Sequence, residues 1–298
     1  MYEKNNPRAY LYLVPALVLL AFFMIYPLID VFIYSFEEGY SFVSKSFMGY
    51  GFYNYHYVLQ DTYFLQALKN TLIMVIITVP LSTIIALLIA YGITQIKGFQ
   101  KLYQTIFFLP YVTNTIAVGL VFLIMFDKTP YNEGFVNLII KMFGGSSIDF
   151  IDGTYAQKMF VMCFYIIWVV MPYKILVLVG ALSSVPKTLY DAARVDQTSK
   201  ARTFRKITIP MISPMLSYLV ITGFIGAFKE YNNAVALFGT DLDAQGMNTI
   251  VGYVYSMLYN ETGGYPSYAS AAAIILFLIV LTITCINLLV SRRRVFVG

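Results

Sequence analysis

Charge is scarce in this chain of 298 residues: only 12% are Asp, Glu, Lys or Arg, whereas 59% are hydrophobic. Soluble domains carry about 25% charged residues, so too few are present to cover a soluble core of this size. The two cysteines, Cys163 and Cys285, lie inside apolar runs, which argues against a disulfide framework or a thiolate metal site. A single histidine, His56, excludes a His-rich metal centre. The composition predicts an integral membrane protein.

Several apolar stretches are long enough to cross a membrane, because a transmembrane helix needs about 20 mostly apolar residues. The first exceeds the roughly 7–15 residues of a signal-peptide core and has no small-residue cleavage site, so we expect it to be retained. We expect residues 1–9 to be a cytoplasmic N-terminus and residues 10–298 to form one transmembrane domain. The predicted spans are residues 10–36, 68–95, 104–126, 158–184, 211–236 and 268–291.

Basic residues are distributed unevenly between the connecting segments. With the N-terminus inside, six crossings give inside segments with 13 basic and three acidic residues, and outside segments with six basic and 11 acidic ones. Cytoplasmic loops are enriched in Lys and Arg, so the sequence predicts an all-α membrane protein with six transmembrane helices and both termini in the cytoplasm. The net charge of +5 then faces membrane lipid, and no nucleic-acid partner is expected.

Residues 185–210 form a long polar insertion between the fourth and fifth spans. After Pro186, apolar residues recur at near-helical spacing, and Asp191 lies in the first turns, where the helix dipole favours an acid. A second short helix is expected over residues 200–207, ending before Pro210, which would break it. Periodicity alone leaves two interpretations open: a solvated basic loop near anionic lipid headgroups, or a surface that docks a partner.

The same loop reads Asp-Ala-Ala, three residues, Gln, nine residues and Ile-x-Ile-Pro. It resembles the signature loop of ABC importer permeases, which reads Glu-Ala-Ala, three residues, Gly, nine residues and Ile-x-Leu-Pro. Glycine there permits a left-handed turn that costs another residue about 1–2 kcal/mol, so Gln197 predicts a strained turn or a different one. The resemblance implies that the residues that dock an ATPase are Asp191, Ala192, Ala193, Arg194, Asp196, Gln197, Ile207 and Pro210.

Shorter segments, in the expected order, resemble the carbohydrate-type permeases related to the larger membrane subunit of the maltose transporter. This chain lacks that subunit's extra N-terminal helices and large periplasmic insert, so it resembles the short, six-helix form with the type I ABC importer permease fold. The segments are Tyr26-Pro27-Leu28, Ser35-Phe36, Asn54-Tyr55, Ala67-Leu68-Lys69-Asn70-Thr71, Leu109-Pro110-Tyr111 and Tyr268-Ala269-Ser270-Ala271-Ala272-Ala273.

The resemblance implies a transmembrane half-channel in a bacterial plasma membrane. Its expected partners are a second permease subunit, two copies of a cytoplasmic ATPase, and an external binding protein that delivers a carbohydrate, most simply an oligosaccharide. The channel would work by alternating access, with the loop as a lever. The sequence has no Gly-x-x-x-x-Gly-Lys-Ser/Thr phosphate-binding loop, so we expect no cofactor and no enzymatic activity here, with ATP bound by the partner subunits.

The densest polar cluster runs from Lys229 to Asn233, near the outer end of the fifth span. Amides, charges and an aromatic face suit a sugar, although an ordinary interfacial helix end is the alternative. Alignment with the maltose subunit implies sugar-contacting positions at Tyr111, Thr115, Ile166, Val169, Val170, Gly226 and Lys229. The candidate substrate-binding residues are Tyr111, Thr115, Lys229, Glu230, Asn232 and Asn233.

Three of the aligned positions depart from the maltose subunit, since Ile166 replaces an amide, Gly226 a hydroxyl and Lys229 an aromatic ring. Maltose is therefore not expected to bind here in the same way. Lys229 leaves open an anionic substrate, such as an acidic sugar or glycerol phosphate, although the adjacent Glu230 would neutralise its charge. Lys174 lies deep within a span, where an ionisable residue is functional by default. We nevertheless expect a structural role, in which the side chain reaches toward the membrane interface or pairs with Asp30.

An ion-coupled secondary transporter is the main alternative of another class. Such proteins often contain inverted repeats and buried carboxylates near the middle of the membrane, and this sequence shows no convincing repeat and few acids within its spans. A membrane enzyme is less well supported, because paired carboxylates, a Ser-His pair and a metal constellation are all missing from the sequence.

Overall fold

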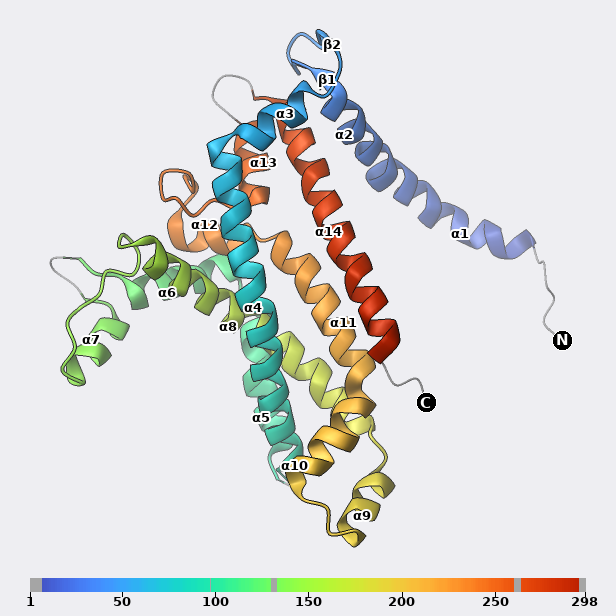
Figure 1. Cartoon of the computed structure of the whole chain (residues 1–298), viewed down its shortest axis with the longest axis vertical. Helices are drawn as coiled ribbons and strands as arrows, with labels where there is room; N and C mark the ends of the chain where they lie inside the picture. The colour runs from blue at the N-terminus through green and yellow to red at the C-terminus, as the bar shows by residue number, and fades with distance from the viewer. Residues whose placement is uncertain (1–6, 97, 130–132, 260–263, 295–298) are drawn as a thin grey trace. The chain divides into compact units, whose positions relative to one another are not determined.

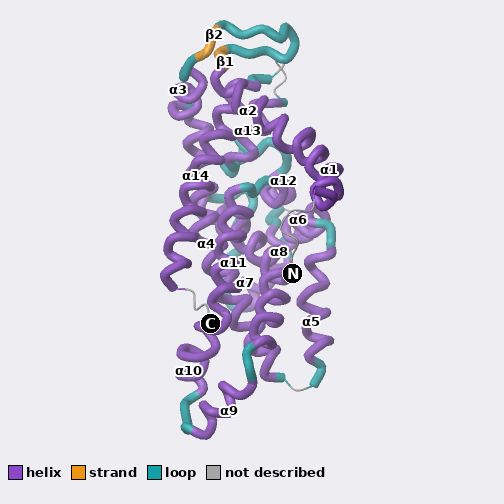
Figure 2. Tube along the Cα trace, turned by 90° about the vertical axis from the view of Figure 1, so that its right-hand side faces the viewer, coloured by secondary structure: helices purple, strands orange, loops and turns teal. Residues whose placement is uncertain are grey.

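Helices make up most of the described chain, and its strands form one short hairpin (Figure 2). The structure is a computed structural model. Part of the predicted N-terminal segment, residues 1–6, lies outside the described residues. The described residues are 7–96, 98–129, 133–259 and 264–294.

Backbone contacts divide the chain into two compact units. Three helices, α4, α13 and α14, contribute residues to both of them. Unit 1 comprises residues 1–65 and 253–278, and unit 2 comprises residues 66–252 and 279–298.

Unit 1 begins with a long apolar helix whose best membrane-spanning window, within Leu11–Phe36, has none of its residues buried inside the chain. Such a helix requires lipid or another subunit around it. Its other elements are a hairpin and the helices that follow (Figure 1). The elements are α1 (Pro7–Leu20), a π-helical turn η1 (Ala21–Ile25), α2 (Tyr26–Phe36), β1 (Glu37–Glu38), β2 (Gly49–Tyr50), α3 (Tyr53–Gln60), most of α13 (Ile250–Leu258) and the first part of α14 (Pro266–Arg294).

Asn54 joins the end of α2 to α3. Its amide nitrogen donates to the backbone oxygens of Ser35 and Glu37 at 3.0 and 3.1 Å. Ser267, at the start of α14, donates to the same Glu37 oxygen at 2.6 Å. Helix ends leave carbonyl groups without helical partners, so these side chains satisfy the end of α2. The Asn54-Tyr55 segment therefore has a structural role.

Unit 2 is built around α8, whose inward side chains are almost all apolar and buried. Buried residues alternate along its length with exposed ones, and α4 and α11 supply further parts of the same cores. The elements of unit 2 are most of α4 (Thr62–Gln95), α5 (Gln100–Phe108), a 3₁₀ turn η2 (Leu109–Val112), α6 (Thr115–Phe126), α7 (Phe135–Met142), α8 (Tyr155–Ser184), α9 (Lys187–Val195), α10 (Lys200–Thr203), a π-helical turn η3 (Phe204–Thr208), α11 (Ile209–Phe228) and α12 (Asn232–Phe238).

The predicted span over 104–126 is broken. η2 and α6 meet at a bend of 96°, where Thr113 is extended and Asn114 caps α6 by accepting from the backbone nitrogens of Ile116 and Ala117. An N-cap of this kind starts a new helix axis. Pro110, in η2, cannot donate to a continuous α-helical ladder, so the sequence around residues 109–114 turns the chain instead of extending it.

The predicted span over 211–236 also ends early, at Phe228. Glu230 accepts from the backbone nitrogens of Tyr231 and Asn233, at 3.1 and 3.0 Å, so it satisfies free amides at the start of α12. Two helices therefore replace the single predicted one. α12 packs against α6, and its residues Ala234, Ala236 and Leu237 are buried.

Pro210 does not end a helix as the sequence predicted. Helical backbone continues from Lys200 to Phe228 through the π-helical turn η3, which ends at Thr208. The same arrangement precedes Pro27, where the π turn η1 ends at Ile25. A wider π turn relieves the clash between a proline ring and the carbonyl four residues earlier, so both prolines are accommodated within long helices.

Five described helices are long and apolar enough to cross a membrane, and the bent α5–η2–α6 segment adds a sixth candidate if it counts as one span. The multi-pass helical architecture predicted from the sequence is confirmed. The number six and the inside position of both termini stay predictions.

Candidate functional site

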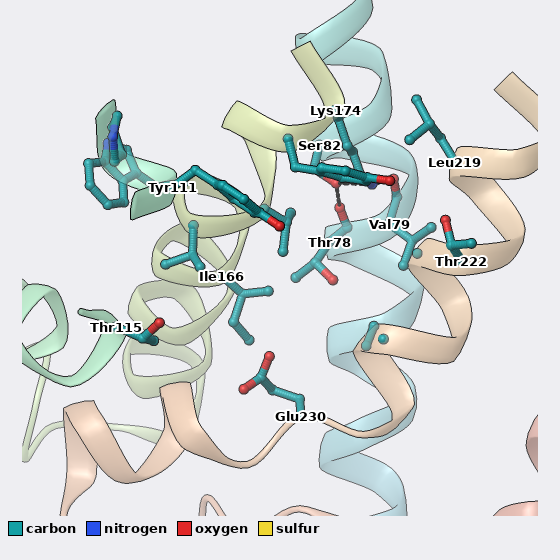
Figure 3. Close-up of a pocket in the computed structure, with 18 of the residues that line it drawn as sticks. Thr78, Val79, Ser82, Tyr111, Thr115, Ile166, Lys174, Leu219, Thr222 and Glu230 are labelled. Carbon is teal, nitrogen blue, oxygen red and sulfur yellow. Dashed lines mark hydrogen bonds between the residues drawn. The ribbon is translucent and has the colours of Figure 1, made fainter. Parts of the chain in front are cut away.

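One cavity lies entirely within unit 2 and has a volume of about 350 Å³. Its walls come from α4, η2, α6, α8 and α11, together with the segment after α11 (Figure 3). The lining combines aromatic rings with hydroxyl groups and two charged residues. The lining residues are Thr78, Val79, Ser82, Pro110, Tyr111, Thr113, Thr115, Val118, Ile166, Trp168, Val169, Val170, Tyr173, Lys174, Leu219, Thr222, Gly223, Gly226, Ala227 and Glu230.

Six of the seven positions that the alignment implied are among these lining residues. They are Tyr111, Thr115, Ile166, Val169, Val170 and Gly226, which come from three separate stretches of the sequence. The seventh, Lys229, is exposed and does not line the cavity. The six aligned positions therefore lie on one surface. Lys229, which suggested an anionic substrate, lies outside it.

The polar cluster over residues 229–233 is divided by the structure. Glu230 lines the cavity, whereas Asn232 is exposed and Asn233 is buried behind it. The amide of Asn233 donates to Glu230 at 2.8 Å, so this pair holds the turn into α12. Asn232 and Asn233 are not brought to the cavity.

Two tyrosines form an aromatic wall. The rings of Tyr111 and Tyr173 stack with centroids 5.8 Å apart and 24° between their planes. The hydroxyls of Tyr173 and Tyr218 share a hydrogen bond of 3.1 Å, which links α8 to α11. Tyr111 is 52% exposed, so its ring face is open to a ligand.

Lys174 is the buried charge of the cavity, with only 4% of its surface exposed. Its Nζ donates to the hydroxyls of Ser82 and Thr83 at 2.7 and 2.9 Å, and to the Val79 carbonyl at 3.4 Å. Figure 3 shows Lys174 and Ser82 at one end of the cavity and Glu230 at the other.

The loop between α8 and α11 contains the left-handed turn that Gln197 made doubtful. Gln197 has φ = +51°, and its backbone nitrogen donates to Arg194 while that of Thr198 donates to Ala193. This pair of bonds is the Schellman ending of a helix, which glycine usually provides. Of the two possibilities left open, the structure shows the strained turn.

The helix α9 carries its charges on the outside. Asp191 forms an ion pair with Arg194 one turn later, and both side chains are largely exposed. Ala193 is buried and Ala192 is exposed. On another face, the hydroxyls of Tyr190 and Thr208 share a hydrogen bond of 3.1 Å that ties α9 to η3. Asp196 is exposed, and Pro210 follows η3 within α11.

Sequence reasoning missed part of the cavity wall: Thr78, Ser82, Trp168, Tyr173 and Thr222. One signal was available, because Thr78 and Ser82 are polar residues within a largely apolar span and lie four residues apart, which places them on one helix face. The link between Tyr190 and Thr208 had no comparable signal, since it joins two helices across a turn.

Comparison with known proteins gives the family. The model of the family described as "Binding-protein-dependent transport system inner membrane component" matches residues 82–295. The arabinooligosaccharides transport system permease protein AraP of Bacillus subtilis (strain 168) is 30% identical over 302 residues, covering 98% of this chain and 90% of AraP. The lactose transport system permease protein LacF of Rhizobium radiobacter is 27% identical, with 98% and 96% covered.

A solved structure has the same fold. It is a bacterial ABC transporter involved in the import of the acidic polysaccharide alginate, with a TM-score of 0.81 and 22% identity, over 96% of this chain and 95% of that one. The family match spans most of the chain and includes the loop at α9 and all of the cavity-lining residues except Thr78 and Val79. This decides against a secondary transporter and confirms a transport permease instead of an enzyme. The chain belongs to the binding-protein-dependent transport system inner membrane components, the multi-pass permease subunits of ABC importers.

Proposed function

We propose that this chain is one half of the channel of an ATP-driven carbohydrate importer, and that the cavity in unit 2 holds the sugar during its passage. The observation that carries the proposal is the lining: Tyr111 and Tyr173 offer aromatic faces beside the hydroxyls of Thr78, Thr115 and Thr222. Sugar rings stack their apolar faces on aromatic rings and exchange hydrogen bonds with hydroxyls. The relatives named for arabinooligosaccharides and lactose support the same class of substrate.

A second permease is the proposed partner of the α1–α2 helix. The best membrane-spanning window of that helix is apolar and has no residue buried within its own chain, which leaves this surface free for a second subunit. The external binding protein required by the family delivers the substrate, and two cytoplasmic ATPase subunits supply the energy.

The loop at α9 is the proposed ATPase-docking element. Val195 is 83% exposed although apolar, and it lies beside Ala192 and the ion pair of Asp191 with Arg194. A small, partly apolar and charged surface suits a groove on another protein. The hydrogen bond between Tyr190 and Thr208 would carry movement of α9 into α11, which lines the cavity, and so switch access from one side of the membrane to the other.

The test is binding-protein-stimulated ATPase activity of the assembled importer in nanodiscs, measured with a panel of neutral and acidic glycans. We expect one glycan class to stimulate the ATPase and Asp191→Lys to abolish the stimulation. The matched control is Asp152→Lys, which reverses an exposed aspartate before α8, away from the loop. An assembled importer that no glycan stimulates would remove the carbohydrate assignment, and equal loss in both variants would remove the docking role.

A further inference from the structure

Lys174 places a positive charge at the cavity without a negative partner. Among the described residues of unit 2, no carboxylate lies within 4.0 Å of its Nζ; the ion pairs there are Lys141 with Glu133 and Arg194 with Asp191. Its three acceptors, on Ser82, Thr83 and Val79, are all uncharged. A charge in such a position is expensive to bury and is usually kept for a function.

The hydroxyls around Lys174 are arranged to receive its protons. Ser82 donates to the backbone oxygen of Thr78, and Thr83 donates to that of Val79 at 2.7 Å. Since each hydroxyl has one proton, both present only lone pairs to Lys174. The lysine must therefore be the donor to both, and with the Val79 carbonyl it faces three acceptors, which match the three protons of an ammonium. These bonds hold the ammonium in place and leave its charge uncancelled.

Glu230, the acidic residue of the cavity, does not neutralise the charge of Lys174. Glu230 lies at the opposite end of the cavity (Figure 3), and its two oxygens accept from Tyr231 and Asn233 at the start of α12. Lys229, the other lysine near the cavity, is exposed and outside the lining. Neither Lys174 nor Glu230 has an ion-pair partner among the described residues, and the two lie at opposite ends of the cavity (Figure 3), so the end at Lys174 carries a positive charge that no nearby carboxylate neutralises.

Space beside the ammonium is kept by a glycine. A Cβ added at Gly223 on α11 would lie 3.4 Å from Lys174 Nζ and 3.2 Å from a methyl of Val79. Tyr173, which precedes Lys174, turns its ring toward Tyr111 to form the aromatic wall. A sugar stacked on that wall would have its substituents close to the ammonium.

We infer that Lys174, held by Ser82 and Thr83, is an anion subsite that makes this cavity select carbohydrates bearing a carboxylate or a phosphate. The inference deepens the proposed function and rests on it. On binding, the ammonium exchanges its longest contact, to the Val79 oxygen at 3.4 Å, for an oxygen of the anion. The hydroxyls of Ser82 and Thr83 keep their places, so little reorganisation is needed. The neutral substrates of some relatives and the acidic substrate of another show that this fold serves both kinds.

The chain contains its own reporter, because Trp168 lines the cavity and is the only tryptophan in the sequence. The experiment is a fluorescence titration of the purified full chain in amphipol with galactose, galacturonate and galactose 6-phosphate, which share one ring and differ in charge. Charge-assisted hydrogen bonds are worth about tenfold in affinity. We expect galacturonate, galactose 6-phosphate or both to bind about tenfold more tightly than galactose, and the stronger of the two to identify the anion.

Lys174→Met should remove that preference, so that the three sugars bind about equally, whereas Lys229→Met, a matched change outside the cavity, should retain it. Equal binding of the three sugars by the unmodified chain, no response to any of them, or a preference lost in Lys229→Met instead would each overturn the subsite. The comparison within the unmodified chain does not depend on how any variant folds. Stimulation of the assembled importer by neutral glycans alone would overturn the subsite while leaving the proposed function in place.

Discussion

The cavity and the loop at α9 belong to the same unit, and their charges differ in burial and in partners. In the cavity, Lys174 is buried among uncharged acceptors. At the loop, Asp191 and Arg194 are exposed and neutralise each other. A buried, uncompensated charge costs stability, whereas an exposed ion pair contributes almost nothing to it. The buried charge of Lys174 therefore lowers stability and is present for its chemistry. The conformation of the loop depends instead on its backbone and on the contact of Tyr190.

The largest expected effect concerns packing near the cavity. A Cβ added at Gly119 would overlap the Cβ of Ala236, where α6 packs against α12. We expect Gly119→Val to lower the free energy of unfolding by about 3 kcal/mol. Ala192→Val, on the exposed face of α9, should leave it nearly unchanged. Thermal unfolding in detergent measures the stability of the two variants. Similar midpoints would show that α6 and α12 are not tightly packed beside the cavity.

Removing one charge from each region tests whether the buried charge of Lys174 lowers stability. Lys174→Met replaces a buried ammonium with an apolar side chain of similar length, and Ser82 and Thr83 keep their bonds to backbone oxygens. We expect the variant to be more stable by about 1–2 kcal/mol. Arg194→Met at the loop should leave the unfolding midpoint where it is. A lower midpoint for Lys174→Met would mean that the lysine holds α4 and α8 together and that its charge is not a cost.

The turn after α9 tests whether backbone strain sets the loop's stability. Gln197→Gly places at φ = +51° the residue that adopts it most readily. Glycine removes the cost of the left-handed conformation, but it also loses more conformational freedom on folding. The two effects together predict that the free energy of unfolding rises by about 0.5–1 kcal/mol. Hydrogen exchange of the α9 amides should become slower by a few-fold. Faster exchange would indicate that the Gln197 side chain stabilises the turn.

The smallest effect is a pH dependence in the loop before α7. The Lys141 ammonium and the Ser147 hydroxyl donate hydrogen bonds to Glu133. These bonds lower the pKa of its carboxyl below the ordinary value of 4.5. Because the folded pKa is the lower one, the stabilisation is complete above pH 4.5 and is lost as the pH falls through the folded pKa. Hydrogen exchange around Ser147 should be faster at pH 3.5 than at pH 6 after correction for intrinsic rates, and Glu133→Gln should remove the difference. A pH difference that persists in that variant would assign it to other groups.

The features that the sequence predicted best are those determined by neighbouring residues. The helix α9 follows from a short stretch of chain, so spacing and residue type were sufficient. At Gln197 the family resemblance left a strained turn and a different turn open, and the structure shows the left-handed one. Hydrophobicity located the long helices but did not predict the break at Asn114 or the cap at Glu230, because both depend on side chains that end a helix within an apolar run.

The cavity was harder to predict than the loop. Six lining positions followed from the alignment, but the polar cluster over 229–233 turned out to contribute only Glu230. Which face of a helix meets a cavity is decided by packing with distant segments. The partners of Lys174 illustrate this, since Ser82 and Thr83 lie more than 90 residues earlier in the sequence.

The most direct test of the central claim, that substrate passes through the cavity of unit 2, is to fill it. A Cβ at Gly226, which lines the cavity, would meet no atom within 4 Å, and the same is true at Gly180 on α8, outside the lining. Uptake of the stimulating glycan by proteoliposomes containing the whole importer would be compared for Gly226→Trp and Gly180→Trp. The account predicts that Gly226→Trp abolishes uptake while basal ATPase activity remains, and that Gly180→Trp transports normally. Normal uptake by an assembled Gly226→Trp importer would contradict it.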